Sequence, residues 1–202
     1  MQFCKASTVI LALTIWLAGS VAAVAGSKSA MRLSGPTAPP IGHVEFCAEH
    51  HGECDAHDKP NKIVFLTSQT WARLDAVNRA VNTSILPATD MEIFGTMEKW
   101  AYPAFVGDCE DYVLQKRRDL IAAGWPASAL LITVVRDEDG DGHAVLTVRT
   151  DRGDLVLDNK SDEIVLWDAA PYQFVKRQSA RHASAWDAIE DARTAAVGSV
   201  RR

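Results

Sequence analysis

One cysteine of this chain lies in a segment suited to nucleophilic chemistry. Cys109 falls within residues 107–112, which read GDCEDY. If a helix begins at Asp108, the thiol lies in its first turn, where unpaired backbone N–H groups and the helix dipole favour the thiolate. The thiolate is the form of cysteine that attacks carbonyl carbons. The alternative is a buried and inert cysteine, which is the commoner fate of a single thiol.

Two residues further along the chain have the types needed to activate that thiol. His143 opens a predicted strand, and Asp158 ends the next one, fifteen residues later. If the chain reverses near residues 151–153, Asp158 returns to within a few positions of His143. Covalent catalysis commonly uses a nucleophile beside a base that is oriented by a carboxylate. Here His143 would take the thiol proton, and Asp158 would fix the tautomer of the His143 ring. The spacing alone is moderately specific, because any hairpin can carry a histidine and an aspartate.

The carboxylates beside Cys109 oppose formation of a thiolate. Asp108 and Glu110 flank it, and like charges raise the pKa of a thiol. The helix dipole, a protonated His143 or a bound cation must offset them. One interpretation is structural, because Asp108 can cap a helix and Asp111 suits a first turn. The other is a calcium site at Asp108 and Glu110, because Ca²⁺ binds clustered carboxylate oxygens. The remaining ligands are not identifiable from the sequence.

The helices that position these residues are predicted from periodicity and stop signals. Apolar residues recur at helical spacing from Thr67 or Ser68 to about Thr83. A second helix is expected from Asp108 to just before Gly124. A last helix is expected over 184–196.

The second half of the chain changes to short runs typical of strands. Five strands are expected, joined by turns too short for crossover helices, at residues 130–136, 143–150, 154–158, 164–167 and 172–178. Helices followed by successive short strands predict an α+β fold with helices packed on an antiparallel sheet.

The turn before His143 imitates a calcium loop. Asp137, Asp139, Asp141 and Gly142 reproduce the start of an EF-hand. The twelfth position is Val148, where the EF-hand needs a bidentate glutamate. We therefore expect a solvated hairpin turn here.

The N-terminus has the features of an export signal. Lys5 precedes an apolar run over 9–18, and an A-x-A cleavage site ends at Ala25. We expect residues 1–25 to be a signal peptide, 26–42 a flexible leader rich in Ser, Gly and Pro, and 43–202 a single domain. An uncleaved anchor is the alternative, although the apolar run is short for a membrane span. The expected location is periplasmic or secreted, without stable membrane insertion after cleavage.

The cysteine count changes when the signal is removed. The chain has four cysteines, and cleavage removes Cys4. Cys47 and Cys54 are seven residues apart, so the economical pairing is a Cys47–Cys54 disulfide with Cys109 left free. The pattern of Cys47, His50, Cys54 and His57 leaves zinc as an alternative.

Composition excludes several other classes of protein. The 202 residues are 48% hydrophobic and 23% charged, values typical of a globular domain rather than of a disordered or coiled-coil chain. The formal net charge of −5 argues against broad binding to nucleic acid or anionic lipid.

Three blocks of the sequence resemble the bacterial transglutaminase-like cysteine proteinases. They are residues 107–112 (GDCEDY), 142–146 (GHAVL) and 156–159 (VLDN), which occur in the family's order. The resemblance runs from about Cys47 to Trp186. It implies a papain-like or transglutaminase-like core with Cys109 as nucleophile, His143 as base and Asp158 as orienter.

The resemblance also implies a function. The family includes calcium-dependent periplasmic proteases that release surface adhesins, and their motif has acidic residues on both sides of the cysteine, as Asp108 and Glu110 are here. The expected activity is hydrolysis of a peptide or amide bond in a protein substrate, without a cofactor in the triad itself. Two alternatives stay open: a transamidase or deamidase using the same triad, and a non-enzymatic binding module on this fold.

Overall fold

The computed structural model describes residues 29–193, and an antiparallel sheet is their main feature. In chain order its strands are β1 (Leu33–Thr37), β4 (Leu130–Arg136), β5 (Gly142–Thr150), β6 (Gly153–Leu157), β7 (Val165–Leu166), β8 (Gln173–Gln178) and β9 (Trp186–Ile189). Their order in the sheet is β1-β9-β8-β4-β5-β6-β7, and every neighbouring pair is antiparallel. A separate short pair, β2 (Leu86–Pro87) and β3 (Val106–Gly107), is parallel.

The helices lie mainly in the first half of the described chain. They are α1 (Ile41–Glu49), α2 (Ser68–Ser84), α3 (Asp90–Phe94) and α4 (Cys109–Ala122), with short 3-10 turns η1 (His51–Glu53) and η2 (Ala127–Ala129). A capping box starts α2: Thr67 Oγ1 accepts from the Thr70 N–H at 3.1 Å, and Thr70 Oγ1 accepts from the Thr67 N–H at 2.7 Å. This local bonding explains why the helix begins where the sequence predicts.

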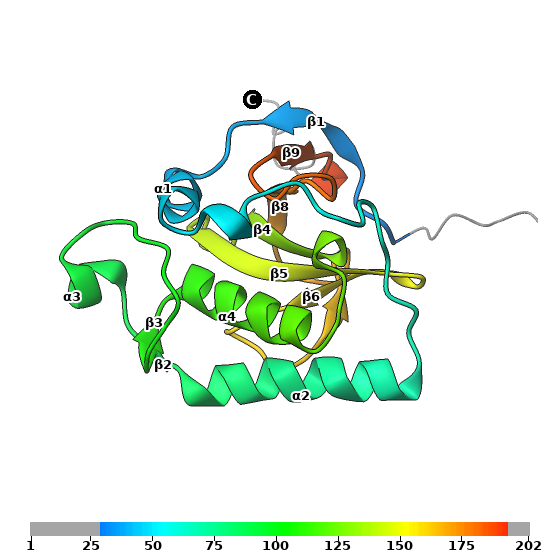
Figure 1. Ribbon diagram of the computed structural model, residues 1–202, viewed down its shortest axis with the longest axis horizontal. Coiled ribbons are helices and arrows are strands. Elements are labelled where there is room, and N and C mark those ends of the chain that lie inside the picture. The colour runs from blue at the N-terminus through cyan, green and yellow to red at the C-terminus, as the bar shows by residue number, and fades with distance from the viewer. Residues whose placement is uncertain (1–28, 194–202) are drawn as a thin grey trace, which may run out of the picture.

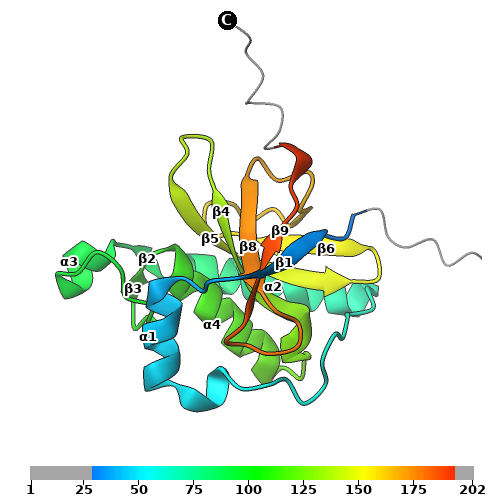
Figure 2. The ribbon, with the colours of Figure 1, turned by 90° about the horizontal axis from the view of Figure 1, so that it is seen from above.

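The core fixes the position of α4. This helix lies between α2 and the sheet (Figure 1), and the view from above shows the strands in front of both helices (Figure 2). Leu114 and Leu120 of α4 belong to one buried cluster with Ile132 of β4 and Leu146 of β5. Full burial of each such side chain contributes about 1.5–3 kcal/mol. The first residue of α4, Cys109, is therefore held by a well-packed layer.

The predicted fold class is confirmed. The helices at 68–84 and 109–122 and the strands β4 to β8 all lie within two residues of their expected bounds. The antiparallel order also brings β5 beside β6, with Leu146 opposite Leu157. This register brings the residues that open β5 close to the residue that follows β6.

The flexible leader expected over 26–42 is wrong from Leu33 onward. Residues 33–37 form β1 at the edge of the sheet, opposite β9, and α1 begins at Ile41. Gly35 has φ of +125° at an irregularity in the pairing, and Pro36 follows it. Edge strands tolerate both glycine and proline, so this segment forms a strand although its composition is typical of a loop. The domain therefore begins before residue 43.

The helix expected over 184–196 is also wrong within the described residues. Residues 186–189 form β9, which pairs with β8 on one side and β1 on the other. Trp186 and Ile189 are both buried, and their three-residue spacing imitates a helix. Residues 186–189 form a strand rather than a helix because they pair with strands on both sides and because Trp186 is buried. Residues 194–196 lie outside the described residues.

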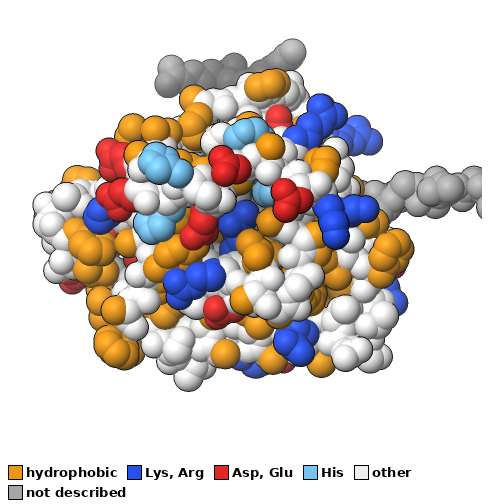
Figure 3. All heavy atoms as spheres, viewed as in Figure 1, with side chains coloured by type: hydrophobic (Ala, Val, Ile, Leu, Met, Phe, Trp, Pro, Cys, Tyr) orange, Lys and Arg blue, Asp and Glu red, His pale blue; other side chains and the backbone are white. Residues whose placement is uncertain are grey.

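The signal peptide expected at 1–25 also lies outside the described residues. Between residues 29 and 193, no helix combines the length and apolar character needed to cross a bilayer. Acidic and basic side chains are interspersed over the middle of the face in Figure 3. That part of the surface therefore offers no continuous basic area for a nucleic acid.

Candidate active site

Cys109 is the first residue of α4, as the sequence predicts. Asp108 precedes it in an extended conformation, and the first helical bond runs from the Tyr112 N–H to the Asp108 carbonyl at 3.2 Å. The Cys109 Sγ atom accepts a hydrogen bond from the Ala144 N–H at 3.3 Å and donates one to Glu110 Oε2 at 3.1 Å. Burial raises the pKa of the thiol well above its ordinary value, and the charge and hydrogen bond of Glu110 raise it further.

His143 and Asp158 form a buried pair. His143 Nε2 lies 2.9 Å from Asp158 Oδ1, and both side chains are almost fully buried. This contact leaves Nδ1 as the ring nitrogen that Asp158 does not engage. Cys109 and His143 line the same cavity of about 230 Å³, together with Trp100. The structure thus joins His143 to Asp158 and brings His143 and Cys109 to the same cavity.

Tyr172 holds the second oxygen of Asp158, a role that sequence reasoning missed. Its Oη atom donates to Asp158 Oδ2, and its ring centroid lies 5.4 Å from that of His143. Burial by itself would raise the pKa of Asp158. Hydrogen bonds from His143, Tyr172 and the Lys160 N–H outweigh the effect of burial and hold this pKa below its ordinary value. The carboxylate is therefore kept ionised against His143.

The acidic cluster beside Cys109 contains a residue that the sequence does not reveal. Asp90, at the start of α3, lies with Asp108 and Glu110 so that one oxygen from each falls within 4.8 Å of the others. Asp90 Oδ1 and Asp108 Oδ1 are buried and have no hydrogen-bond partner among the described residues. Asp108 occupies the N-cap position, yet its side chain makes no capping bond and accepts instead from the Asp90 N–H at 3.3 Å. The capping interpretation of this side chain is therefore wrong.

Crowding of these carboxyl groups shifts their proton affinities. Burial, then the charge of Asp108, raises the pKa of Glu110 to about 8. Burial also raises the pKa of Asp111 to about 7, with further increases from Asp108 and Asp90. Burial raises the pKa of Asp108 as well, and the charge of Asp90 adds to it. A cluster of this kind binds either protons or a cation, and its hard oxygen donors fit Ca²⁺.

Gly107 is required by the close approach of Asp111. A Cβ atom at position 107 would lie 2.7 Å from Asp111 Oδ2 and 2.8 Å from Asp111 Cβ. Asp111 is itself fixed, because Oδ1 accepts from the Ala101 N–H at 2.9 Å. We expect Gly107→Ala to lower the free energy of unfolding by about 1–3 kcal/mol, as overpacking does. Thermal unfolding measures this, with Gly52→Ala as the control because position 52 opens onto free space. Equal stability of the two variants would contradict the assignment.

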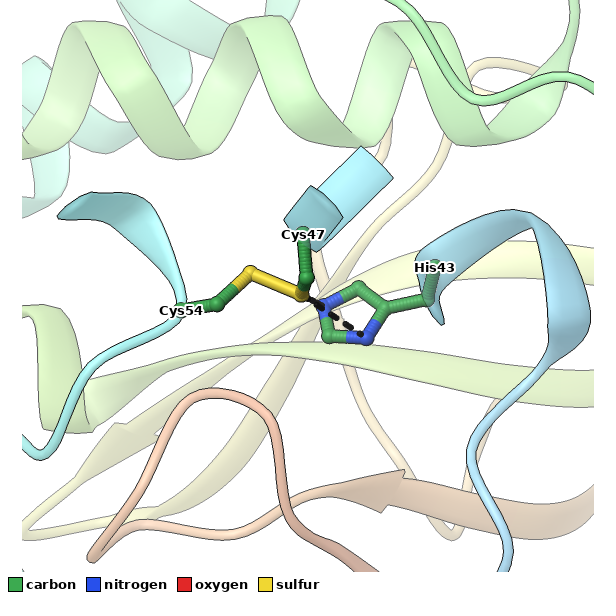
Figure 4. A group of neighbouring side chains, drawn as sticks. All are labelled: His43, Cys47 and Cys54. Atoms are coloured by element: carbon green, nitrogen blue, oxygen red, sulfur yellow. Dashed lines mark hydrogen bonds between the residues drawn. A yellow bond between two sulfur atoms is a disulfide. The ribbon is translucent and has the colours of Figure 1, made fainter. Parts of the chain in front are cut away.

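The early cysteines form the predicted disulfide. Cys47 and Cys54 are bonded, and Cys109 is the free cysteine of the described chain. Figure 4 shows the His43 ring beside this disulfide, with Nδ1 3.7 Å from Cys47 Sγ. Because the two sulfur atoms are bonded to each other, the zinc alternative at this segment is not supported.

The turn at 137–142 joins β4 to β5, as the sequence predicts. A hydrogen bond within the turn runs from the Asp141 N–H to Asp137 Oδ1 at 2.9 Å.

Known proteins resemble this chain in both sequence and structure. The family model described as bacterial transglutaminase-like cysteine proteinase (BTLCP) matches residues 33–194. The solved structures that are similar include LapG of Legionella pneumophila in a calcium-bound form, at 26% identity and a TM-score of 0.48, covering 54% of this chain and 64% of that one. The EGTA-treated form matches at 25% identity and a TM-score of 0.50, covering 62% of this chain and 73% of that one.

This chain thus spans slightly less than two thirds of the calcium-bound LapG structure. No curated protein sequence matches. The family match covers β1 to β9 and includes every residue of the site. The chain belongs to the bacterial transglutaminase-like cysteine proteinase family.

Proposed function

We propose that this chain is an exported cysteine peptidase that hydrolyses a peptide bond of a protein substrate. The observation that carries the proposal is the pair of His143 and Asp158, joined at 2.9 Å, in which His143 lines the same cavity as Cys109. Nucleophile, base and orienting carboxylate together make up the machinery of acyl transfer. The family match supports the same reaction class.

In this proposal the reaction proceeds through an acyl-enzyme. His143 takes the proton of the Cys109 thiol, and the sulfur attacks the carbonyl carbon of the substrate. The Cys109 backbone N–H, at the N-terminus of α4, donates to the oxygen that becomes negative. His143 then protonates the leaving amine, and water releases the acyl group. Asp158 keeps the ring in the tautomer whose Nδ1 accepts the thiol proton, and it stabilises the imidazolium.

The thiol must change partners before it reacts. Its hydrogen bond runs to Glu110 in the present structure, whereas the reaction needs the proton on His143. A carboxylate beside the thiol also disfavours the thiolate. Whatever neutralises the carboxylates therefore favours the reactive form.

We propose calcium as the cation that does so. Asp90, Asp108 and Glu110 would hold the ion, because they present clustered oxygens and two of these lack partners. A bound Ca²⁺ supplies two positive charges beside the cysteine. In this proposal the ion offsets the acidic residues, while Cys109 and His143 carry out the chemistry.

Export and a surface-protein substrate complete the proposal. The Cys47–Cys54 disulfide fits an oxidising compartment, as the predicted signal peptide does. We propose periplasmic or secreted proteins as substrates, with a surface adhesin among them by resemblance to the family. Mass spectrometry of products from candidate surface proteins tests the reaction type. Cleaved peptides support hydrolysis, whereas crosslinked or deamidated products without cleavage would overturn it.

Removal of the Tyr172 hydroxyl tests how Asp158 is held. Tyr172→Phe keeps the ring against His143 and deletes one hydrogen bond to a charged oxygen. Such bonds contribute about 1.5–3 kcal/mol, so we expect kcat/KM to fall about tenfold or more. The matched control is Tyr102→Phe, which deletes the hydroxyl bond to Glu53 outside the site. Comparable losses of activity in the two variants, measured at equal folded fraction, would count against a role for Tyr172.

A further inference from the structure

A second cavity lies at the edge of the sheet where β1, β9 and β8 are neighbours. Its volume is about 370 Å³, and it shares no lining residue with the cavity of Cys109 in the described chain. Its charged lining consists of three arginines and one carboxylate: Arg149, Arg177, Arg181 and Asp187. Three positive charges and one negative charge leave an excess of two positive charges, in a protein whose formal net charge is −5.

The cavity lies on the face of the sheet that points away from α4. Successive side chains of a strand point to opposite faces. In β4, Ile132 packs in one cluster with Leu114 of α4, so the next residue, Thr133, points to the other face. Arg177 of β8 is the register partner of Thr133, and Asp187 of β9 is the register partner of Arg177. A ligand in this cavity would therefore be separated by the sheet from the site at the start of α4.

Hydrogen bonds fix the loops that form two walls of the cavity. The Asn61 N–H donates to the Ala180 carbonyl at 2.9 Å, and the Arg181 N–H donates to Ser179 Oγ at 3.4 Å. Asn61 has φ of 55°, a left-handed conformation that asparagine tolerates better than most residues. The loop before α2 is thus held against the connection from β8 to β9. The cavity is formed without a ligand, as binding sites for small molecules usually are.

The described residues neutralise these arginines only in part. Arg177 is 5% exposed and pairs through Nη1 with Asp154 Oδ2 at 2.9 Å. Its Nε atom is buried and has no partner among residues 29–193. Neither Arg149 nor Arg181 forms an ion pair within the same residues, and Arg149 reaches only the Lys62 carbonyl, at 3.5 Å. Two guanidinium groups that line the cavity therefore lack a counter-ion in the described chain.

The chemistry of the lining indicates an oxyanion. A guanidinium group presents a planar set of N–H donors that binds the oxygens of a phosphate or a carboxylate in pairs. The excess of two positive charges fits a phosphate monoester, whose charge near neutral pH is about −1.5 to −2, better than it fits a singly charged carboxylate. The Ser179 hydroxyl adds a further donor, and Leu33 and Pro36 of β1 add an apolar side for an organic substituent.

We propose that this cavity binds a phosphate group through Arg149, Arg177 and Arg181. Arg177 is the fixed part of the site, because burial and its pair with Asp154 hold it in place. Arg149 contributes from β5 and Arg181 from the connection between β8 and β9. Binding here is independent of the proposed peptidase reaction, because the two cavities share no residue. A free phosphate and a lipid headgroup present the same oxygens, and the experiments below separate them.

Calorimetry with inorganic phosphate tests the site, in a calcium-free buffer that contains no other oxyanion. We expect saturable binding by the wild type and an affinity about tenfold lower in Arg181→Gln, which loses a charge-assisted contact. Arg181 is exposed, so its replacement leaves the core intact. The double variant Arg149→Gln/Arg181→Gln should show no saturable binding. Arg73→Gln is the matched control, because it removes the same charge from an exposed position of α2.

A substitution of Asp187 should change the affinity in the opposite direction. Asp187→Asn removes the carboxylate that lines the cavity, and with it a charge that repels the anion. We expect phosphate to bind about threefold or more tightly than it binds the wild type. Damage to the fold would weaken binding instead, so tighter binding identifies a direct effect of charge. An affinity equal to or below that of the wild type in Asp187→Asn would count against the proposal.

NMR and vesicles show where the phosphate binds and which molecule carries it. On titration with phosphate, the amide signals of Asn61, Ala180 and Arg181 should shift, whereas that of Ala144, which donates to Cys109 Sγ, should not. Sedimentation with phosphatidylcholine vesicles that contain phosphatidic acid, lost in Arg181→Gln, would assign the site to a lipid headgroup. Binding of inorganic phosphate without binding to these vesicles would assign it to a small soluble phosphate.

Three results would overturn the proposal. The first is the absence of saturable heat when phosphate is added to the wild type. The second is an equal loss of affinity in Arg73→Gln and Arg181→Gln, which would reduce the effect to the overall charge of the protein. The third is an affinity for acetate equal to that for phosphate, which would show that the cavity does not prefer a phosphate group.

Discussion

Cys109→Ala is expected to lose hydrolysis of protein substrates by about 10⁴-fold or more, which is the scale of nucleophile removal in triad enzymes. The substitution removes the atom that forms the acyl-enzyme, and no other described cysteine is free to replace it. The fold should persist, because α4 is anchored through Leu114 and Leu120 in the core. We expect the melting temperature to stay within a few degrees of wild type.

Alkylation of Cys109 measures the same site without a substrate. Under non-reducing conditions the Cys47–Cys54 disulfide does not react, so iodoacetamide labels Cys109 alone in the signal-free protein. We expect the rate at neutral pH to fall by about tenfold or more in His143→Ala, because the base that takes the thiol proton is gone. His182→Ala, which changes an exposed histidine, serves as the control.

Substrate trapping extends the test to cells. In a strain that carries Cys109→Ala, proteins normally cut should accumulate at full length, and proteomics of the envelope and medium identifies them. Full hydrolysis by purified Cys109→Ala would remove the central claim. Equal alkylation rates for wild type and His143→Ala would show that His143 does not activate the Cys109 thiol.

The site was predictable where it depends on neighbours in sequence. His143 and Asp158 belong to consecutive strands, and one tight reversal fixes their register. The helix that carries Cys109 follows from the helical pattern of its sequence and from the stop signal at Gly124. Local rules of this kind place residues to within a few positions without knowledge of the rest of the fold.

Long-range pairing could not be predicted in the same way. The sequence predicts a leader over residues 33–37 and a helix over 186–189, whereas the two segments are strands that pair with each other in the sheet. About 150 residues separate them, so neither segment carries a local signal of its partner. A strand with Gly and Pro, and a strand whose buried residues are three apart, become strands only in each other's presence.

Asp90 and Lys116 show two further limits of prediction from the sequence. Asp90 is the first residue of α3, whose start is fixed by a capping box between Thr89 and Glu92. The neighbouring Asp90 side chain nevertheless turns inward, toward residues eighteen or more positions away. Lys116 did carry a signal, because it interrupts the apolar stripe of its helix. Such an interruption identifies an unusual residue but does not reveal that its ammonium is fully buried without a hydrogen-bond partner among the described residues.

Asp90 also provides the sharpest test of calcium binding, because it lies far from Cys109 in sequence. Asp90→Asn keeps the shape of the side chain, including an oxygen that accepts the hydrogen bond from the Lys99 N–H. It removes one of the three clustered carboxyl groups. Affinity for Ca²⁺ follows the number of charged ligands, so we expect calorimetry to show a loss of about 100-fold or more. Proteolysis stimulated by Ca²⁺ in the wild type should require correspondingly more of the ion.

The acidic turn before β5 supplies the matched control for this experiment. Asp139 belongs to a pattern that imitates a calcium loop, yet it is exposed on a turn between two strands and lacks the glutamate that such loops need. Asp139→Asn removes the same charge from the protein and should leave Ca²⁺ affinity within about twofold of wild type, since exposed charges act weakly at a distance.

If Asp139→Asn abolishes binding while Asp90→Asn does not, the ion binds at the turn and not beside the cysteine. If the wild type gives no heat with Ca²⁺ and a chelator leaves its activity unchanged, the carboxylates beside Cys109 are neutralised by protons, and their raised pKa values account for the cluster without a metal.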